Sequence, residues 1–168
     1  RPRRSDPLAL DLDGDGIETT GIGTWGTTTL FDHDGDGNLE GTGWLSGDDG
    51  WLARDIDGNG TIDSGRELFG ENTLAQGQQT ASDGFSALAA LDSNADGSID
   101  SEDIAFGELL VWRDLNQDGR SQTGELHSLT ELGISSLSLT ASDSAQTQNG
   151  NLISAVSHYS RTDGTSGQ

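Results

Sequence analysis

Short apolar segments alternate with acidic, glycine-rich segments along the first half of the chain. Residues 23–32 are rich in Thr and aromatic side chains, and residues 44–45 and 51–53 are short apolar runs of the kind found in strands. Residues 6–80 are therefore predicted to form short strands joined by loops. The aromatic side chains of this half are expected to form a small core rather than a ligand-stacking surface: Trp25, Phe31, Trp44 and Trp51.

The second half begins with a pattern that favours helices. Residues 85–91 predict a short helix that Ser82 can cap, and the apolar run at 104–112 predicts another. A third helix is predicted at 126–132. Because an acidic loop separates each helix from the next, residues 81–133 are expected to form an EF-hand-like pair with a shared middle helix.

The C-terminal part alternates apolar and polar positions. Residues 134–160 are predicted to form a β-hairpin, since two alternating stretches flank a polar connection that ends in Asn-Gly. Residues 161–168 are expected to be frayed, and residues 1–5 are expected to be a linker. The expected fold class is α+β, with a single calcium-stabilised domain over residues 6–160.

The charge of the chain changes this picture. The 168 residues include 29 acidic and 8 basic side chains, which give a formal net charge of −21, and hydrophobic residues make up only 30%. Such a composition alone is typical of a disordered chain. Most of the acidic residues, however, fall at fixed spacing in five loops, where bound cations would neutralise them. We therefore expect a chain that is loose without Ca²⁺ and compact with it.

The composition also excludes several classes of partner. An acidic chain does not attract nucleic acid or anionic membrane surfaces, and no apolar run is long enough to span a membrane. The sequence contains no Cys, and all of its basic side chains are Arg. Because it does not begin with Met, we expect a piece of a longer protein. We also expect a monomer that is exported, since millimolar extracellular Ca²⁺ fills weak sites.

The five acidic loops share the pattern Asp-x-Asp/Asn-x-Asp/Asn-Gly, which offers side-chain oxygens at positions 1, 3 and 5 and a turn glycine at position 6. Acidic turns without a metal are the alternative, but this repeated spacing favours Ca²⁺, with up to about five ions. The candidate ligands are Asp11, Asp13, Asp15, Asp32, Asp34, Asp36, Asn38, Glu40, Asp55, Asp57, Asn59, Thr61, Asp63, Glu67, Asp92, Asn94, Asp96, Ser98, Asp100, Asp103, Asp114, Asn116, Asp118, Arg120 and Glu125.

Two of the loops depart from the EF-hand spacing. In the first loop position 12 is Ile22, so Asp48 or Asp49 is expected to complete the ligand set from elsewhere in the fold. In the third loop position 12 is Arg66, a poor ligand, and Glu67 follows one residue later. We interpret the third loop as widened by one residue, with Glu67 as its bidentate carboxylate.

The bond between Asp6 and Pro7 lies four residues before the first loop. An Asp carboxylate can close a five-membered ring onto its own backbone carbonyl, and the tertiary amide of proline is less committed to the trans form. An ordinary turn is the alternative interpretation. If Ca²⁺ anchored residues 7–10, it would restore the effective molarity of this intramolecular attack. His33, in the second loop, is a candidate proton donor or a bystander.

Several strings of residues resemble the self-processing module of FrpC-like repeats-in-toxin proteins. The longest is Asp-Pro-Leu-Ala-Leu-Asp-Leu-Asp-Gly-Asp-Gly-Ile-Glu at residues 6–18, and Val-Trp-Arg-Asp-Leu-Asn-Gln-Asp-Gly at residues 111–119 is another. Shorter matches are Leu-Phe-Asp-His at 30–33 and Leu-Asp-Ser-Asn at 91–94. The resemblance covers roughly residues 6–140 and is weak beyond them.

The resemblance implies a calcium-triggered, single-turnover cleavage of the chain's own Asp6-Pro7 bond through an aspartic anhydride. Hydrolysis, or transfer of the Asp6 acyl group to a lysine amine as an isopeptide bond, would follow. Because this chain has no Lys, the acceptor is expected upstream or on another protein. The implied location is secreted, extracellular or at the bacterial cell surface. The competing interpretation is a non-catalytic calcium-binding folding module, which the other four loops fit equally well.

Overall fold

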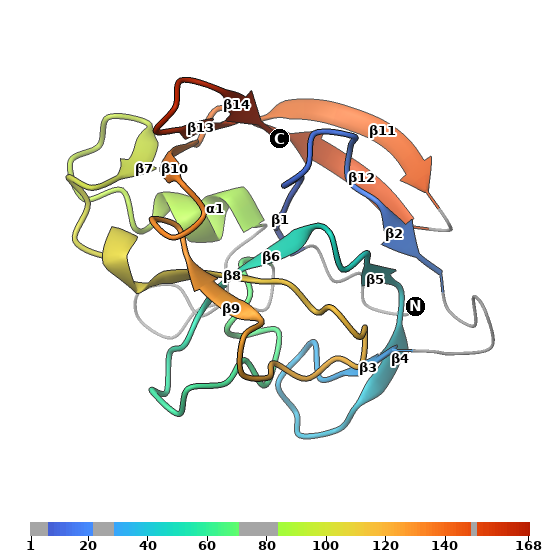
Figure 1. Ribbon diagram of the computed structural model, residues 1–168. Coiled ribbons are helices and arrows are strands. Elements are labelled where there is room, and N and C mark those ends of the chain that lie inside the picture. Colours follow the sequence, from blue (N-terminus) through green and yellow to red (C-terminus); the bar gives the residue numbers. More distant parts are fainter. Residues whose placement is uncertain (1–6, 22–28, 71–83, 149–150) are drawn as a thin grey trace.

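The computed structural model describes residues 7–21, 29–70, 84–148 and 151–168, and most of its regular structure is short antiparallel strands (Figure 1). The described residues contain one α-helix, α1 (Gly84–Ala89), and a 3₁₀ turn at Phe106–Glu108. The strands are β1 (Ala9–Leu10), β2 (Thr19–Thr20), β3 (Thr29–Phe31), β4 (Glu40–Thr42), β5 (Trp44–Leu45), β6 (Gly50–Arg54), β7 (Ser98–Asp100), β8 (Leu109–Trp112), β9 (Leu126–Ser128), β10 (Ile134–Ser138), β11 (Ser142–Gln148), β12 (Asn151–Val156), β13 (Tyr159–Arg161) and β14 (Ser166–Gly167).

A four-stranded sheet, in the order β1-β6-β8-β9, separates two hydrophobic cores. Successive side chains of a strand point to opposite faces, so β1, β6 and β8 each supply both cores. In β8, Leu109 and Val111 pack into the first core, while Leu110 and Trp112 pack into the second. A strand buried on both faces is apolar at every position, and this explains the unbroken apolar run at residues 109–112.

The first core lies between this sheet, helix α1 and a second sheet in the order β14-β13-β10-β7. Ile99, Ile134 and Tyr159 contribute to it from the second sheet, and Leu88 contributes from α1. Strands from both ends of the chain therefore bury side chains in one core. In Figure 1, β13 and β14, at the red end of the chain, run above α1 and close to the blue segment that follows β1.

The second core is aromatic. Phe31, Trp44, Trp51 and Trp112 lie within it, with the ring centroids of Trp44 5.2 Å from those of Phe31 and Trp51 and 5.4 Å from that of Trp112. Tilted and edge-on pairs at these separations add to the area that the rings bury. The predicted aromatic core is confirmed for its described members, while Trp25 lies outside the described residues.

The prediction of a helical EF-hand pair at residues 81–133 is wrong. A short helix does precede the fourth loop, but residues 109–112 form β8 and residues 126–128 form β9. Short apolar runs fit a buried strand as well as a buried helix, and pairing of β8 with both β6 and β9 decides in favour of the strand. The fold is mostly β, in several small antiparallel sheets, and the α+β prediction fails with the helices.

The C-terminal strands pair differently from the hairpin expected over residues 134–160. β10 lies between β7 and β13 in the second sheet, and the hairpin is formed by β11 with β12 instead. Residues 161–168, which were expected to fray, complete β13 and contain β14, and the carbonyl of Gln168 accepts a hydrogen bond from the Asp11 N–H at 2.8 Å. Pairing across long sequence separations decides both outcomes.

Candidate metal centre

All five acidic loops have the same backbone geometry. The carboxylate at position 1 of each loop accepts a hydrogen bond from the N–H of the glycine at position 6, over 2.8–3.0 Å. Positions 4 and 6 have positive φ in every loop, with the position-6 glycines at φ 73–104°. Ala95 and Gln117 are the two non-glycine residues at position 4, at φ 61° and 57°. This repeated conformation turns positions 1, 3 and 5 around a common centre.

A second carboxylate closes each loop by accepting a hydrogen bond from the N–H at position 2. In the first loop this carboxylate is Asp49, which accepts from Leu12 at 3.2 Å and from Glu18 at 2.9 Å. The closing carboxylates of the other four loops are Glu40, Glu67, Asp103 and Glu125, with distances of 2.7–3.2 Å to the position-2 N–H. The interpretation of Glu67 as the late acid of a widened third loop is consistent with this geometry.

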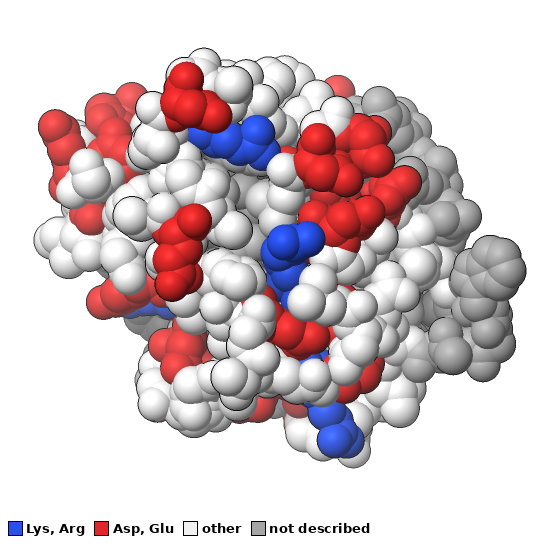
Figure 2. Space-filling view, viewed as in Figure 1, with Lys and Arg blue, Asp and Glu red and all other residues white. Residues whose placement is uncertain are grey.

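Three of the loops gather carboxylate oxygens within 4.8 Å of one another, as a metal site requires. The clusters are Asp11, Asp13 and Asp49; Asp32, Asp34, Asp36 and Glu40; and Asp55, Asp57 and Glu67. Of the two acids expected to complete the first loop, the structure therefore selects Asp49. In Figure 2 the acidic side chains gather in separate groups on the visible face, with few basic side chains among them.

The remaining candidate ligands lie in the same five loops but outside these three clusters. In the fourth and fifth loops, amides at position 3 donate to the acids at position 5, from Asn94 to Asp96 at 3.0 Å and from Asn116 to Asp118 at 3.1 Å. The candidates outside the clusters are Asp15, Asn38, Asn59, Thr61, Asp63, Asp92, Asn94, Asp96, Ser98, Asp100, Asp103, Asp114, Asn116, Asp118, Arg120 and Glu125.

The chemistry of the sites fits Ca²⁺. All the side-chain donors are oxygen atoms, and the expected ligands include no Cys or His, which transition metals prefer. Burial raises the pKa of Asp49 to about 6, and burial also raises the pKa of Glu67 and of Asp114. Each of these ionised carboxylates carries a desolvation cost that a bound cation would offset.

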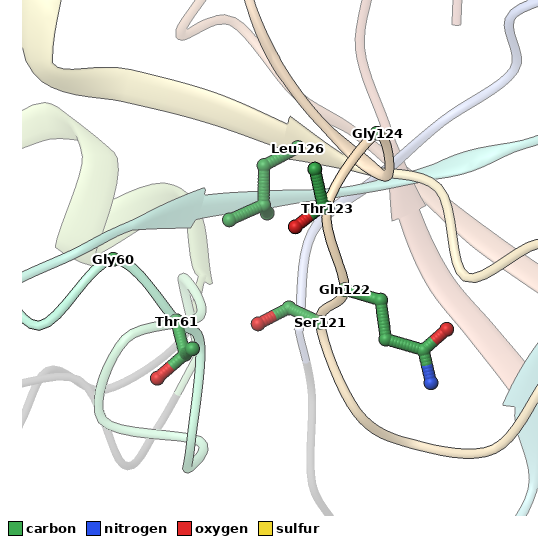
Figure 3. Close-up of a pocket in the computed structure, with 7 residues that line it drawn as sticks. All are labelled: Gly60, Thr61, Ser121, Gln122, Thr123, Gly124 and Leu126. Atoms are coloured by element: carbon green, nitrogen blue, oxygen red, sulfur yellow. The ribbon is translucent and has the colours of Figure 1, made fainter.

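The loops are tied to one another and to the aromatic core. The Gly65 N–H, in the third loop, donates to the Asp32 carbonyl of the second loop at 2.8 Å. The Ile62 N–H, at position 8 of the third loop, donates to the Ser121 hydroxyl, at position 8 of the fifth, at 2.7 Å. Beside this contact the two loops border a hollow of about 470 Å³. Thr61 of the third loop and Ser121 of the fifth loop line it (Figure 3).

The fifth loop contacts the core directly. The indole N–H of Trp44 donates to the Asp114 carboxylate at 2.7 Å, in a contact that is fully buried. The hydroxyl of Thr29 donates to the Gln117 carbonyl at 2.9 Å. Ordering of the fifth loop is therefore linked to packing of the N-terminal half, although Asp114 lies 70 residues after Trp44 and Gln117 lies 88 residues after Thr29.

His33 lies inside the second loop, between the candidate ligands Asp32 and Asp34. Burial lowers the pKa of His33 to about 4, against the opposing effect of the nearby Asp32 and Asp34 carboxylates. One of its ring nitrogens lies 3.0 Å from the hydroxyl of Thr42, and the ring packs edge-on against Phe31 at 5.0 Å. The half-buried imidazole is therefore uncharged at neutral pH, and it packs against the aromatic core.

The chain segment that follows the Asp6-Pro7 bond is held by the central sheet. Asp6 lies outside the described residues. The Leu8 N–H donates to the Phe69 carbonyl at 2.8 Å, and the Leu8 carbonyl accepts from the Leu52 N–H at 3.0 Å. β1 then pairs with β6 and leads directly into the first acidic loop at Asp11. The proline side of the bond is thus fixed between a sheet and a candidate metal site.

No helix in the described part of the chain has the length and apolar character needed to cross a membrane. The model of the SPM domain family matches residues 8–168. The iron-regulated protein FrpA of Neisseria meningitidis serogroup C is 52% identical over 171 residues, which cover 98% of this chain and 15% of FrpA. This similarity confirms the relation to the Frp proteins that the resemblance predicted. The chain belongs to the SPM domain family.

Proposed function

We propose that this domain cleaves its own Asp6-Pro7 bond in a single turnover that requires Ca²⁺ in the acidic loops. The main support is the position of the bond next to the first loop. β1 begins at the second residue after Pro7 and runs straight into the cluster of Asp11, Asp13 and Asp49. Membership of the family and the strings shared with self-processing modules support the same proposal.

The reaction is an intramolecular acyl transfer. A carboxylate oxygen of Asp6 attacks the Asp6 backbone carbonyl carbon, the bond to the Pro7 nitrogen breaks, and that nitrogen takes up a proton. The products are a five-membered aspartic anhydride at the end of the upstream piece and a chain that begins with Pro7. Well-oriented intramolecular reactions gain roughly 7–11 kcal/mol over bimolecular ones, provided that the reacting groups are held in place.

The described residues supply that orientation on the proline side. The backbone of Leu8 is hydrogen-bonded on both sides, to Phe69 and to Leu52, so Pro7 has little freedom to follow the motion of Asp6. Asp49 joins the first loop to the chain 37 residues away and so ties this segment to the folded domain. Bound Ca²⁺ supplies charge neutralisation, which lets the carboxylates of the loop stay together.

The anhydride has two fates. Addition of water gives a free Asp6 carboxylate, whereas attack by a lysine amine gives an isopeptide bond to Asp6. This chain contains no Lys, so its own side chains cannot capture the acyl group as an isopeptide. We infer that the acceptor is a lysine-bearing protein in trans or an upstream segment, and that the reaction occurs outside the cell, where Ca²⁺ is millimolar. The chain matches only 15% of FrpA, so any role of this domain within a longer protein is likewise a proposal.

Intact-mass spectrometry of the purified chain, with Ca²⁺ or with chelator, tests this proposal. With Ca²⁺ we expect loss of residues 1–6 and a product of 162 residues that begins with Pro7. Asp6→Ala should stop cleavage because no carboxylate remains to close the ring, and Asp6→Glu should be much slower because its ring is larger. Asp143→Ala, at an exposed position in β11, is the matched control.

A lysine-containing protein added to the reaction separates the two fates, since only transfer produces a new species with the mass of both partners. If the Asp6→Ala variant is cleaved at the wild-type rate, Asp6 is not the nucleophile. If the unaltered chain stays whole at saturating Ca²⁺, the domain is a non-catalytic calcium-binding module, which is the alternative function.

A further inference from the structure

We propose that Tyr159 and Arg161 are positioning residues for the cleavage reaction, because together they hold the backbone that leads away from the Asp6-Pro7 bond. This inference rests on the proposed function. Both side chains lie on one face of β13, at alternate positions, and reach the start of the first acidic loop from the far end of the chain. Neither residue belongs to the acidic loops.

Two side-chain hydrogen bonds form this clamp. The Tyr159 hydroxyl donates to the Asp11 carbonyl at 2.6 Å, in a buried contact, and Arg161 donates to the Leu12 carbonyl at 2.8 Å. The same terminal nitrogen of Arg161 also donates to the Tyr159 hydroxyl oxygen at 2.7 Å. The guanidinium therefore polarises the hydroxyl that holds Asp11, which strengthens both bonds.

A third contact comes from the chain end itself. The Asp11 N–H donates to the carbonyl of Gln168, the residue after β14, at 2.8 Å, so β13 and the residue that follows β14 hold both backbone polar groups of Asp11. The peptide planes on either side of Asp11 are thereby fixed in direction. Because Asp11 is also position 1 of the first loop, the clamp sets how the strand from Pro7 enters that loop.

The clamp is itself rigid. The Tyr159 side chain is 2% exposed, and the guanidinium of Arg161 lies 5.2 Å from the centroid of the Tyr159 ring. β14 packs against the ring so closely at Gly167 that a Cβ atom there would collide with it. Strand β13 is anchored by β10 on its other side. A buried tyrosine with little rotational freedom can hold its partner with small positional error, as a reacting segment requires.

The clamp joins residues that are far apart in the sequence, and this affects when it can form during folding. Tyr159 lies 148 residues after Asp11, and Arg161 lies 149 after Leu12, so these bonds form only when the C-terminal strands have docked. Cleavage would therefore wait for the completed domain rather than for occupancy of the first loop alone. This placement protects the bond in a partly folded chain, whose loops can already bind Ca²⁺.

The test compares Tyr159→Phe, which removes only the hydroxyl, with Arg161→Gln and with Ser160→Ala as the control. Ser160 lies on the same strand but is exposed on the opposite face. At saturating Ca²⁺ we expect the cleavage rate to fall about fivefold for Tyr159→Phe and about tenfold for Arg161→Gln. The double variant should lose less than the product of these factors, because the two side chains share one hydrogen-bonded unit.

Each cleavage rate is measured together with calcium-dependent folding, which separates a positioning role from a purely structural one. The Ca²⁺ concentration for half-maximal folding, from circular dichroism and tryptophan fluorescence, should change less than about twofold, so that the plateau rate falls in fully folded protein. If the rates fall only in proportion to the folded fraction, or if both variants cleave at the wild-type rate, the clamp does not position the reaction. If the unaltered chain does not cleave, the proposed function itself fails.

Discussion

Replacing Asp49 by Asn should have opposite effects on the domain with and without Ca²⁺. Asp49 is 1% exposed, and its two oxygens accept from the N–H groups of Leu12 and Glu18. Burial raises its pKa from 3.8 to about 6, so the ionised side chain costs the cation-free fold roughly 3 kcal/mol. Asn removes this charge but replaces one acceptor oxygen by an NH₂ group, which leaves one N–H unpaired at a cost of about 1–3 kcal/mol.

In chelator at pH 7, therefore, the free energy of unfolding of Asp49→Asn should exceed that of the unaltered chain by between about zero and 2 kcal/mol. With Ca²⁺ the order should reverse, because the first loop has lost an anionic ligand. Circular dichroism over a calcium titration measures both arms, and intact mass measures the cleavage rate at each concentration. We expect the half-saturating Ca²⁺ for cleavage to rise at least about tenfold. Asp143→Asn, at an exposed residue of β11, is the control.

The sign of the pH effect provides an independent check. Because the pKa of Asp49 is raised in the fold, the folded state binds its proton more tightly than the unfolded state does. In chelator the stability of the unaltered chain should therefore rise as pH falls from about 6 towards 3.8, where the side chain becomes protonated in the fold first, and the advantage of Asp49→Asn should disappear over this range. Equal calcium midpoints, equal cleavage rates and a pH-independent difference would together refute the assignment of Asp49 to the first loop.

The other predictions concern the remaining loops. Chelation should shift the domain from ordered to largely disordered in circular dichroism, and a fully folded chain in chelator would contradict the coupling of folding to metal. Asp114→Ala removes the acceptor of the Trp44 indole and should slow cleavage at least about tenfold while changing tryptophan fluorescence; normal cleavage with weakened calcium binding would refute this coupling. Gly65→Ala places a Cβ against the His33 carbonyl and should cost about 2 kcal/mol in thermal unfolding, whereas Gly107→Ala, in open space, should be neutral.

The loops were predictable from the sequence because their chemistry is local. An acid at position 1 and a glycine at position 6 belong to one short ring of hydrogen bonds, so their spacing alone indicates the turn. The Asp6-Pro7 bond was also found from the sequence alone, since two adjacent residues define it. The closing carboxylate of the third loop, Glu67, was also predictable, since it follows its loop closely in the chain.

The strands of the second half were not predictable in this way. Residues 109–112 are apolar at every position, so neither a period of two nor one of 3.6 is visible, and pairing with β6 and β9 decides their conformation. The sequence pattern around residues 126–132 is equally ambiguous. The sheet buries both faces of residues 109–112, so the helix that helix–loop–helix spacing predicts for them does not form.

The sequence alone revealed the local features: five acidic turns, an Asp-Pro bond beside the first of them, and a negative charge that bound cations would neutralise. How these features are joined became visible in the folded chain. Asp49 reaches Leu12 across 37 residues, and Tyr159 reaches Asp11 across 148. Such contacts leave no spacing signal, because the register of distant strands, and not the neighbouring residues, brings the partners together.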